Sequence, residues 1–215
     1  MKPTTFLPLL ACLSLASCIS NPSPSGFLED YDELQPGNNP YAAKLSYTNP
    51  DTDFSKYDSI MFEPLVFILP DDSKLTEDDK KRLVKAMSDA LNEELRQDYK
   101  FVSSPGPTTM LMRGALTELV PANRPGNVVT SVVPLSRVVS EGQQLTTGMS
   151  TFSARGTGEL EIRDSVTNER LAAVADTRYA RKKATTSATR WGEIEAAMVR
   201  SAKDLRSGLE KLRNR

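Results

Sequence analysis

Hydrophobic and polar residues alternate most regularly between Thr151 and Arg163. Period-two alternation of this kind predicts a β-strand with one buried face and one solvent-exposed face. Residues 164–169 then form a polar turn, and residues 171–181 predict the partner strand of a hairpin. The expected buried face consists of Phe152, Ala154, Gly156, Gly158, Leu160 and Ile162.

Two segments have helical periodicity instead. Residues 76–95 begin with Thr76 and Asp79, a spacing that resembles a capping box, and an apolar stripe follows. In the last helix, apolar residues recur every seven positions, which predicts packing against the sheet. The first stripe is Leu83, Met87, Ala90, Leu91 and Leu95, and the second is Trp191, Met198, Leu205 and Leu212 with Ile194, Ala202 and Leu209 beside it.

Further strands are expected at residues 59–69, 99–103 and 109–120. Pro64 predicts a bulge or an edge position in the first of them. Residues 127–139 are ambiguous, because their β-branched side chains favour a strand whereas Pro134 interrupts one. The order of elements predicts an α+β fold with a mostly antiparallel sheet and two main helices packed on one face.

The N-terminus has the layout of a secretory signal, with Lys2 before an apolar run from Phe6 to Leu15. The run is about half the ~20 residues of a membrane-spanning helix. The following Leu15-Ala16-Ser17-Cys18 resembles the bacterial lipobox, which implies removal of the signal peptide, residues 1–17, by cleavage between Ser17 and Cys18. It also implies acylation of Cys18, with palmitate among its chains. The alternative is an ordinary secreted protein with an incidental thiol.

A lipid anchor predicts three regions, namely the signal peptide, a Pro-rich lipidated tether over residues 18–54, and a single periplasmic α+β domain over residues 55–215. Ile19 stands where aspartate favours inner-membrane retention in lipoproteins of enteric type. We therefore expect the protein at the periplasmic face of the outer membrane.

One part of the tether carries an apolar stripe. Phe27, Leu28, Tyr31 and Leu34 fall at positions i, i+1, i+4 and i+7. Since a linker has no core of its own, these residues either dock on the domain or bind a partner. They are the candidate partner-binding residues.

The composition excludes much chemistry. The chain has no histidine, and its cysteines are Cys12, within the signal, and Cys18. We therefore expect no catalytic residues, metal site or cofactor. Glu159, Glu161 and Asp176 leave a carboxylate-based hydrolase as a minor alternative, but interspersed arginines favour a solvated charged face. Removal of Lys2 with the signal takes the net charge from −1 to −2, which argues against a nucleic-acid partner.

Several segments resemble a family of Gram-negative lipoproteins defined as a domain of unknown function, DUF 3313. The resemblance lies in the motif Ser25 to Leu34, in Pro105-Gly106-Pro107, in Glu159-Leu160-Glu161 and in Asp164 to Thr167. It implies a periplasmic α+β lipoprotein and carries no reaction or ligand. Asn168 departs from the glycine expected after this last segment, but asparagine tolerates a left-handed backbone.

Together these features predict an outer-membrane-anchored periplasmic lipoprotein that acts as a non-catalytic interaction or envelope-assembly module. The membrane is its first partner, through the lipid, and an envelope protein its second. The alternative is a carrier or sensor of a small amphipathic ligand, a lipid or glycan, held between sheet and helices.

Overall fold

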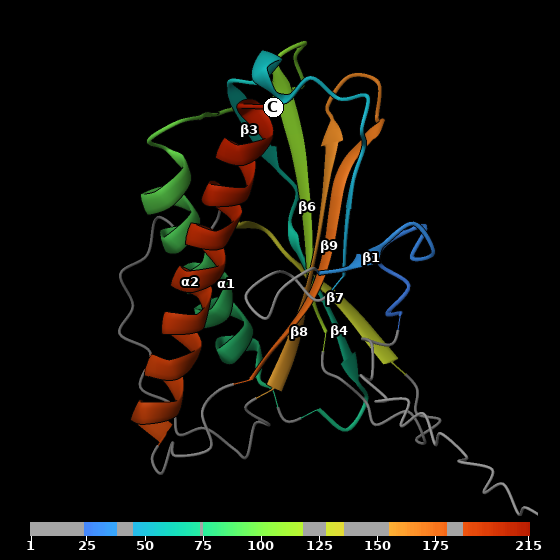
Figure 1. The fold of residues 1–215 in the computed structure, drawn as a ribbon. Helices are drawn as coiled ribbons and strands as arrows, with labels where there is room; N and C mark the ends of the chain where they lie inside the picture. Colours follow the sequence, from blue (N-terminus) through green and yellow to red (C-terminus); the bar gives the residue numbers. More distant parts are fainter. Residues whose placement is uncertain (1–23, 38–44, 74, 118–127, 136–154, 180–186) are drawn as a thin grey trace, which may run out of the picture.

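A computed structural model describes residues 24–37, 45–73, 75–117, 128–135, 155–179 and 187–215. Within these residues, two helices lie side by side on one face of a twisted sheet (Figure 1). The helices are α1 (Glu77–Leu95) and α2 (Ser187–Arg213), with a 3₁₀ turn at Phe54–Lys56. The strands are β1 (Gln35–Pro36), β2 (Leu45–Thr48), β3 (Ser59–Phe62), β4 (Leu65–Pro70), β5 (Lys100–Phe101), β6 (Thr109–Thr117), β7 (Val128–Val133), β8 (Arg155–Asp164) and β9 (Arg170–Tyr179).

The predicted capping box starts α1. The Thr76 hydroxyl accepts a hydrogen bond from the backbone N–H of Asp79 at 3.1 Å, and the Asp79 carboxylate accepts one from the N–H of Thr76 at 3.0 Å. Two N–H groups that the helix leaves unpaired are thus satisfied. Glu77 and Asp78 add negative charge to the first turn, which the helix dipole favours.

The α+β class and the placement of both helices on one face are confirmed, but the sheet is mixed rather than mostly antiparallel. The strand order is β1-β2-β9-β8-β6-β3-β5, and β4 also pairs with β6 and β7. The pairs β3–β5, β3–β6 and β4–β6 are parallel. The helix between β4 and β5 returns the chain to the sheet in the same direction, so β5 is parallel to β3. The connection over residues 102–108 then returns the chain a second time, so β6 is parallel to β3 and β4 as well.

Pro64 divides the predicted strand 59–69 into β3 and β4. β3 pairs with the first half of β6, and β4 pairs with its second half. Between them the N–H of Glu63 still donates to Met112 O at 2.9 Å, whereas proline has no N–H to donate. Within the ambiguous segment, β7 is a strand antiparallel to β4 that ends directly before Pro134, whereas residues 127 and 136–139 lie outside the described residues.

The core between sheet and helices uses the apolar face predicted for β8. Ile162 is buried there and Leu160 packs beside it. In α2, Met198 of the seven-residue series is buried and Leu205 and Leu212 are partly buried against the core, while Ala202 and Leu209, predicted beside the series, are buried. The side chain of Trp191 and residues 151–154 lie outside the described residues. Buried residues of the two clusters on this face include Tyr57, Ile60, Phe67, Leu83, Val84, Leu95, Met110 and Met112.

The β8–β9 hairpin turns as expected. Asn168 has a φ of 60°, the left-handed conformation that asparagine tolerates. The Asp164 carboxylate accepts hydrogen bonds from the N–H groups of Val166 and Thr167, each at 2.9 Å, and from the Tyr57 hydroxyl at 2.8 Å. Burial alone would raise the pKa of Asp164, but these hydrogen bonds outweigh it and hold the pKa well below its usual range.

The folded domain starts earlier in the chain than the tether expected over residues 18–54. Residues 24–37 and 45–54 lie within it, because β1 pairs with β2 and β2 pairs with β9. Phe54 is also part of the core. Proline-rich composition disfavours long regular elements, but it does not prevent short strands from adding to the edge of a sheet.

We expect Thr76→Ala to lower the free energy of unfolding by about 1 kcal/mol, because it removes the cap of α1. Thr76→Ser, which keeps the hydroxyl, is the matched control and should stay close to the wild type. Urea unfolding monitored by circular dichroism measures both. Equal losses in the two variants would contradict the capping role.

Candidate functional site

The second face of β8 is buried, contrary to the solvated face expected from its alternation. Glu161 is 0% exposed and Glu159 2%, and Thr157 and Arg163 are also buried. The alternation correctly identified an apolar face, but it does not reveal whether the polar face meets water or another segment. A segment more than a hundred residues earlier in the chain covers it.

Residues 25–34, which we call the clip, form this cover. In Figure 1 the clip lies on the side of the sheet away from the helices. Leu28 and Leu34 are buried against β2 and β9, in a third cluster with Leu45, Ala173 and Ala175. Phe27, Tyr31 and Tyr47 pack at the margin of this cluster. The molecule thus has three layers, with the helices on one face of the sheet and the clip on the other.

The Tyr31 hydroxyl organises the clip. It donates a hydrogen bond to Glu159 Oε2 at 2.6 Å and accepts the backbone N–H groups of Ser25 at 3.1 Å and Leu28 at 3.2 Å. The Ser25 hydroxyl donates to the same Glu159 oxygen at 2.9 Å. One phenol therefore closes the loop on itself and fastens it to the middle of β8.

The structure also explains two further residues of the motif, Gly26 and Phe27. Gly26 has a φ of +85°, a conformation that side chains with a Cβ rarely adopt. The Arg113 guanidinium lies 5.4 Å from the centre of the Phe27 ring, a cation–π contact. The family motif Ser25 to Leu34 is therefore explained by its fit to the sheet.

Glu159 lies in an environment that favours its neutral form. Burial raises the pKa of Glu159, and the hydrogen bonds from Tyr31 and Ser25 offset this only in part. Burial and the contact with Glu159 also raise the pKa of Tyr31. The second carboxylate oxygen, Oε1, is buried and has no hydrogen-bond partner among the residues that the structure describes.

Glu161, two residues further along β8, lies in an environment that favours its ionised form. Three arginines surround its carboxylate, and we call them the arginine cluster: Arg113, Arg163 and Arg170. Their guanidinium groups lie 2.9, 2.9 and 2.7 Å from its carboxylate oxygens. Burial alone would raise the pKa of Glu161, but the hydrogen bonds and charges of Arg163 and Arg170 outweigh it and lower the pKa.

A bulge gives Arg170 its position. The register of β8 and β9 shifts at Ile162/Arg163, so that Leu171 is an extra residue on β9. Leu171 is buried in the core on the helix side, whereas Arg170 reaches Glu161 on the clip side. A bulge redirects side chains in this way.

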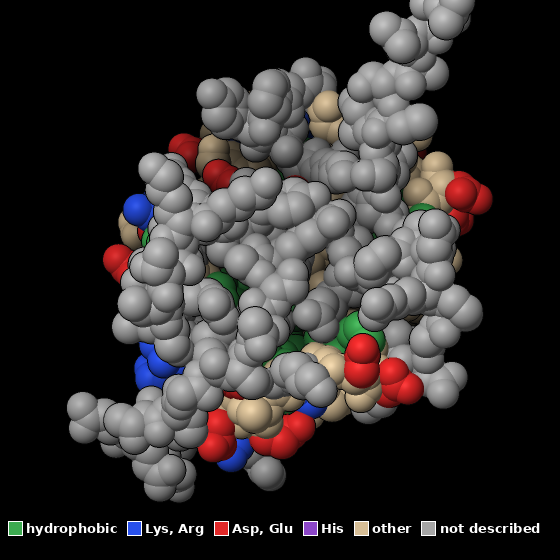
Figure 2. Space-filling model, turned by 90° about the horizontal axis from the view of Figure 1, so that it is seen from below, with side chains coloured by type: hydrophobic (Ala, Val, Ile, Leu, Met, Phe, Trp, Pro, Cys, Tyr) green, Lys and Arg blue, Asp and Glu red, His purple; other side chains and the backbone are tan. Residues whose placement is uncertain are grey.

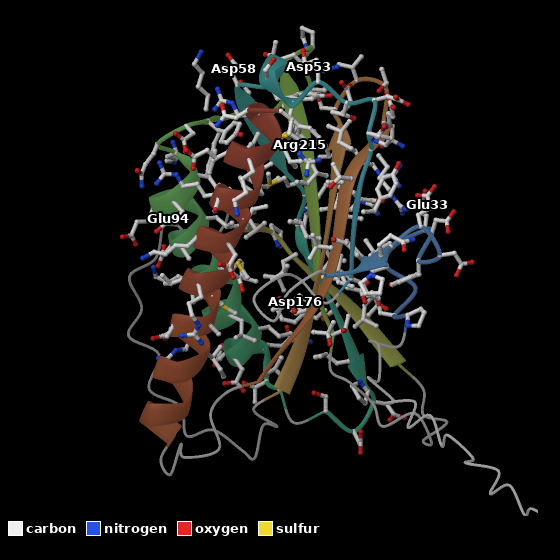
Figure 3. The ribbon with its side chains drawn as sticks, in the orientation of Figure 1. Glu33, Asp53, Asp58, Glu94, Asp176 and Arg215 are labelled. Atoms are coloured by element: carbon white, nitrogen blue, oxygen red, sulfur yellow. The ribbon has the colours of Figure 1, made fainter. Side chains whose placement is uncertain are left out.

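The clip supplies the remaining charges of this network. Glu29 pairs with Arg163 at 2.8 Å, and Glu33 pairs with Arg170 at 3.2 Å. Arg170 also donates to the backbone carbonyl of Asp30 at 3.0 Å. Figure 3 shows Glu33 on the clip, on the side of the sheet away from the helices.

The opposed pKa shifts of Glu159 and Glu161 resemble those of an acid–base pair, but their surroundings differ from those of an active site. Both side chains lie beneath the clip, and neither lines either of two depressions on the described surface. These depressions, of about 380 and 300 Å³, are lined mainly by charged and polar residues. Asp176 is partly buried on β9 and has an interaction of its own.

The described residues contain no group of three or more acidic or cysteine side chains placed to hold a metal ion. Neither of the two depressions described above is an apolar cavity between sheet and helices of the kind that a lipid carrier needs. Figure 2 shows the molecule from below relative to Figure 1. Among the residues that are coloured there, basic and acidic side chains are interspersed around the margin of this end.

The structure brings the candidate partner-binding residues Phe27, Leu28, Tyr31 and Leu34 together on the protein's own sheet. It therefore favours docking on the domain, the first of the two alternatives left open by the sequence. Ser17 and Cys18 lie outside the described residues.

Sequence reasoning missed Ser25 and the arginine cluster as members of the site. Two features of the sequence could have indicated them: charged residues are frequent on one face of β8, and the N-terminal motif is rich in acidic residues that could pair with the arginines.

We expect Tyr31→Phe to destabilise the protein by about 1.5–3 kcal/mol at pH 7, because it removes a hydrogen bond to a buried carboxylate. The hydrogen bond favours ionised Glu159, so its loss raises the pKa of Glu159 further. A raised folded-state pKa means stability that is present at low pH and lost as the pH rises through that pKa. The destabilisation should therefore be larger at pH 7 than at pH 4.

Denaturant titrations at both pH values measure the Tyr31→Phe effect. The matched control is the same change in a Glu159→Gln background, where the cost should shrink and lose its pH dependence. A cost that is the same at both pH values and in both backgrounds would show that Tyr31 acts through packing alone.

We expect Glu161→Gln to cost about 3–5 kcal/mol, because it leaves buried guanidinium groups without their counter-charge. Glu63→Gln is the matched control: Glu63 binds the same Arg113, but its side chain is 44% exposed, so we expect at most about 1 kcal/mol. Since the folded-state pKa of Glu161 is lowered, its contribution is present at neutral pH and is lost as the pH falls through that pKa. Acid titration of stability should therefore bring Glu161→Gln and the wild type together.

Comparison with known proteins agrees with the motif and the fold described above. The sequence profile of the family "Protein of unknown function (DUF3313)" matches residues 23–205. The uncharacterized lipoprotein YdcL of Escherichia coli, in strains K12 and O157:H7, is 33% identical over 166 residues, which are 75% of this chain and 73% of YdcL.

Among solved structures, the PelC dodecamer from Paraburkholderia phytofirmans is similar with a TM-score of 0.40 and 8% identity, covering 74% of this chain and 95% of that chain. A putative neuraminyllactose-binding hemagglutinin homolog from Helicobacter pylori has a TM-score of 0.39 and 11% identity, covering 78% and 92%. These likenesses are too slight to define a shared fold. The profile match and the relationship to YdcL show that the chain belongs to the DUF3313 family of lipoproteins.

Proposed function

We propose that this protein is a lipoprotein anchored through Cys18 at the periplasmic face of the outer membrane, where it acts as a non-catalytic interaction or envelope-assembly module. The lipobox-like residues Leu15 to Cys18 and the lipoprotein relatives support the anchor. None of the helices in the described part of the chain has the length and apolar character needed to cross a membrane.

The observation that carries the non-catalytic part of the proposal is the burial of Glu159 and Glu161 under the clip. These were the carboxylates that the sequence offered for acid–base chemistry, and both instead hold other parts of the protein in place. Glu159 accepts hydrogen bonds from two hydroxyl groups of the clip, and Glu161 neutralises the arginine cluster. A general acid or base must reach the proton that it transfers, within about 3.2 Å or through one water.

We expect Cys18→Ala to abolish incorporation of an alkyne-labelled palmitate analogue and to move the protein from the outer-membrane fraction to the soluble periplasm or to the uncleaved precursor. Two or more acyl chains anchor a protein firmly, and the substitution removes the thiol that would carry the first of them. Cys12→Ala, within the apolar run, is the matched control and should leave labelling and fractionation unchanged. Labelling that persists in Cys18→Ala would contradict the assignment.

The interaction role is tested by capturing the lipidated protein from crosslinked envelopes, with Cys18→Ala beside it. A protein enriched with the wild type and absent from the variant supports an envelope module. Variants of the clip are unsuitable here, because Leu28 and Tyr31 belong to the packing and hydrogen bonding of the domain. Recovery of a lipid or glycan in place of any protein would support the ligand carrier instead.

A further inference from the structure

We infer that the docked clip holds the clip-bearing face of the sheet nearer to the bilayer than the outer surface of the helix layer, which the linker is too short to bring onto the bilayer. This inference rests on the proposed lipidation of Cys18. It is based on the length of chain between Cys18, which carries the lipid, and Ser25, the first residue of the docked clip.

That length is short. Ser25 is attached to β8 through its hydroxyl, which lies 2.9 Å from Glu159 Oε2. From Cys18 to Ser25 the chain makes seven steps, which span at most about 25 Å when fully extended. A flexible tether as long as residues 18–54 would impose no such limit.

Glu159, to which Ser25 is attached, lies near the centre of the sheet. β8 has three strands on either side of it in the order β1-β2-β9-β8-β6-β3-β5, so either edge is about 14 Å away at ~4.8 Å per strand. Glu159 also lies near the middle of β8, about 13 Å or more from either end of the strand at ~3.3 Å per residue.

The helix layer is out of reach from this point. To bring the outer surface of α1 and α2 against the bilayer, the linker would have to pass around an edge of the sheet and then cross the sheet and a helix. The sheet and helix layers together add about 20 Å to the lateral distance. The sum, about 35 Å, exceeds the ~25 Å that the linker spans. The docked clip therefore excludes an arrangement in which the outer surface of the helix layer rests on the bilayer.

The clip-bearing face stands near the lipid without binding tightly to it. Glu29, Asp30, Asp32 and Glu33 are exposed on the clip. Arg163 and Arg170 neutralise Glu29 and Glu33, which leaves Asp30 and Asp32 unmatched within this segment. An anionic bilayer surface repels them within a Debye length of about 8 Å. The expected separation between clip and bilayer surface thus lies between about 8 and 25 Å.

Energy transfer from the domain to labelled lipid headgroups tests the orientation. The mature chain has no cysteine except the acylated Cys18, so one engineered cysteine takes one donor dye. Asp32→Cys reports on the clip, and Lys85→Cys reports on the exposed side of α1. With the lipidated chain in phospholipid vesicles, we expect several-fold more transfer from position 32 than from position 85. Equal transfer from both positions would overturn the inference.

The linker and the clip provide two further variants. Twelve Gly/Ser residues inserted between Asn21 and Pro22 leave the clip intact and extend the reach to about 65 Å, so transfer from the two positions should converge. Leu28→Ala with Tyr31→Phe weakens the clip and should have the same effect, in a chain shown by its thermal unfolding to be folded. A difference between positions 32 and 85 that survives the insertion would contradict the role of the short linker.

Mass spectrometry of the Cys18 peptide separates the two levels of the argument. An unmodified Cys18 would overturn the proposed anchoring and this orientation with it. An acylated Cys18 with equal transfer from both positions would overturn the orientation alone and leave the anchoring in place.

Discussion

The buried carboxylate of Glu161 is the interaction on which the second face of this sheet depends. A fully buried charge is tolerated in a protein interior only when it is paired and hydrogen-bonded, and here three arginines from two neighbouring strands and the bulged end of β9 provide both. The arginines need counter-charges in turn, and the clip brings Glu29 and Glu33 to them. The clip thus completes an electrostatic network as well as an apolar one. A sheet with this face uncovered would expose three guanidinium groups around a single carboxylate.

The clip explains how a proline-rich N-terminal segment becomes part of a folded domain. Leu28 and Leu34 supply the buried area, and Tyr31 supplies the directional contacts that fix the loop. Glu159 accepts these hydrogen bonds, but its pKa is raised and its other carboxylate oxygen is buried without a partner in the described part of the chain. Such features often mark catalytic groups. Here the hydroxyl groups of Tyr31 and Ser25 occupy the space next to the carboxylate, which supports a role in attachment.

For a lipid-anchored protein, the place where the ordered chain begins determines how far the domain extends from the bilayer. The proposed anchor at Cys18 is seven residues from Ser25, so the docked clip limits how far the domain extends from the bilayer. In the proposed arrangement, the outer surface of the helix layer, which carries ion pairs such as Arg82–Glu195 and Arg206–Asp98, is left open to envelope partners. A module that interacts with envelope partners benefits from an orientation set by its own fold.

The sequence by itself determined the α+β class, the two helices, the capping box and the hairpin with Asn168, because each depends on periodicity or on spacing within a few residues. Only the tertiary structure decided that β3, β4, β5 and β6 pair in parallel and that the polar face of β8 is buried under the clip. Alternation along a strand records that one face is apolar, but a row of glutamates and arginines looks the same whether water or a distant segment covers it. The contact of Tyr31 with Glu159 spans 128 residues of sequence, so local pattern carried no information about it.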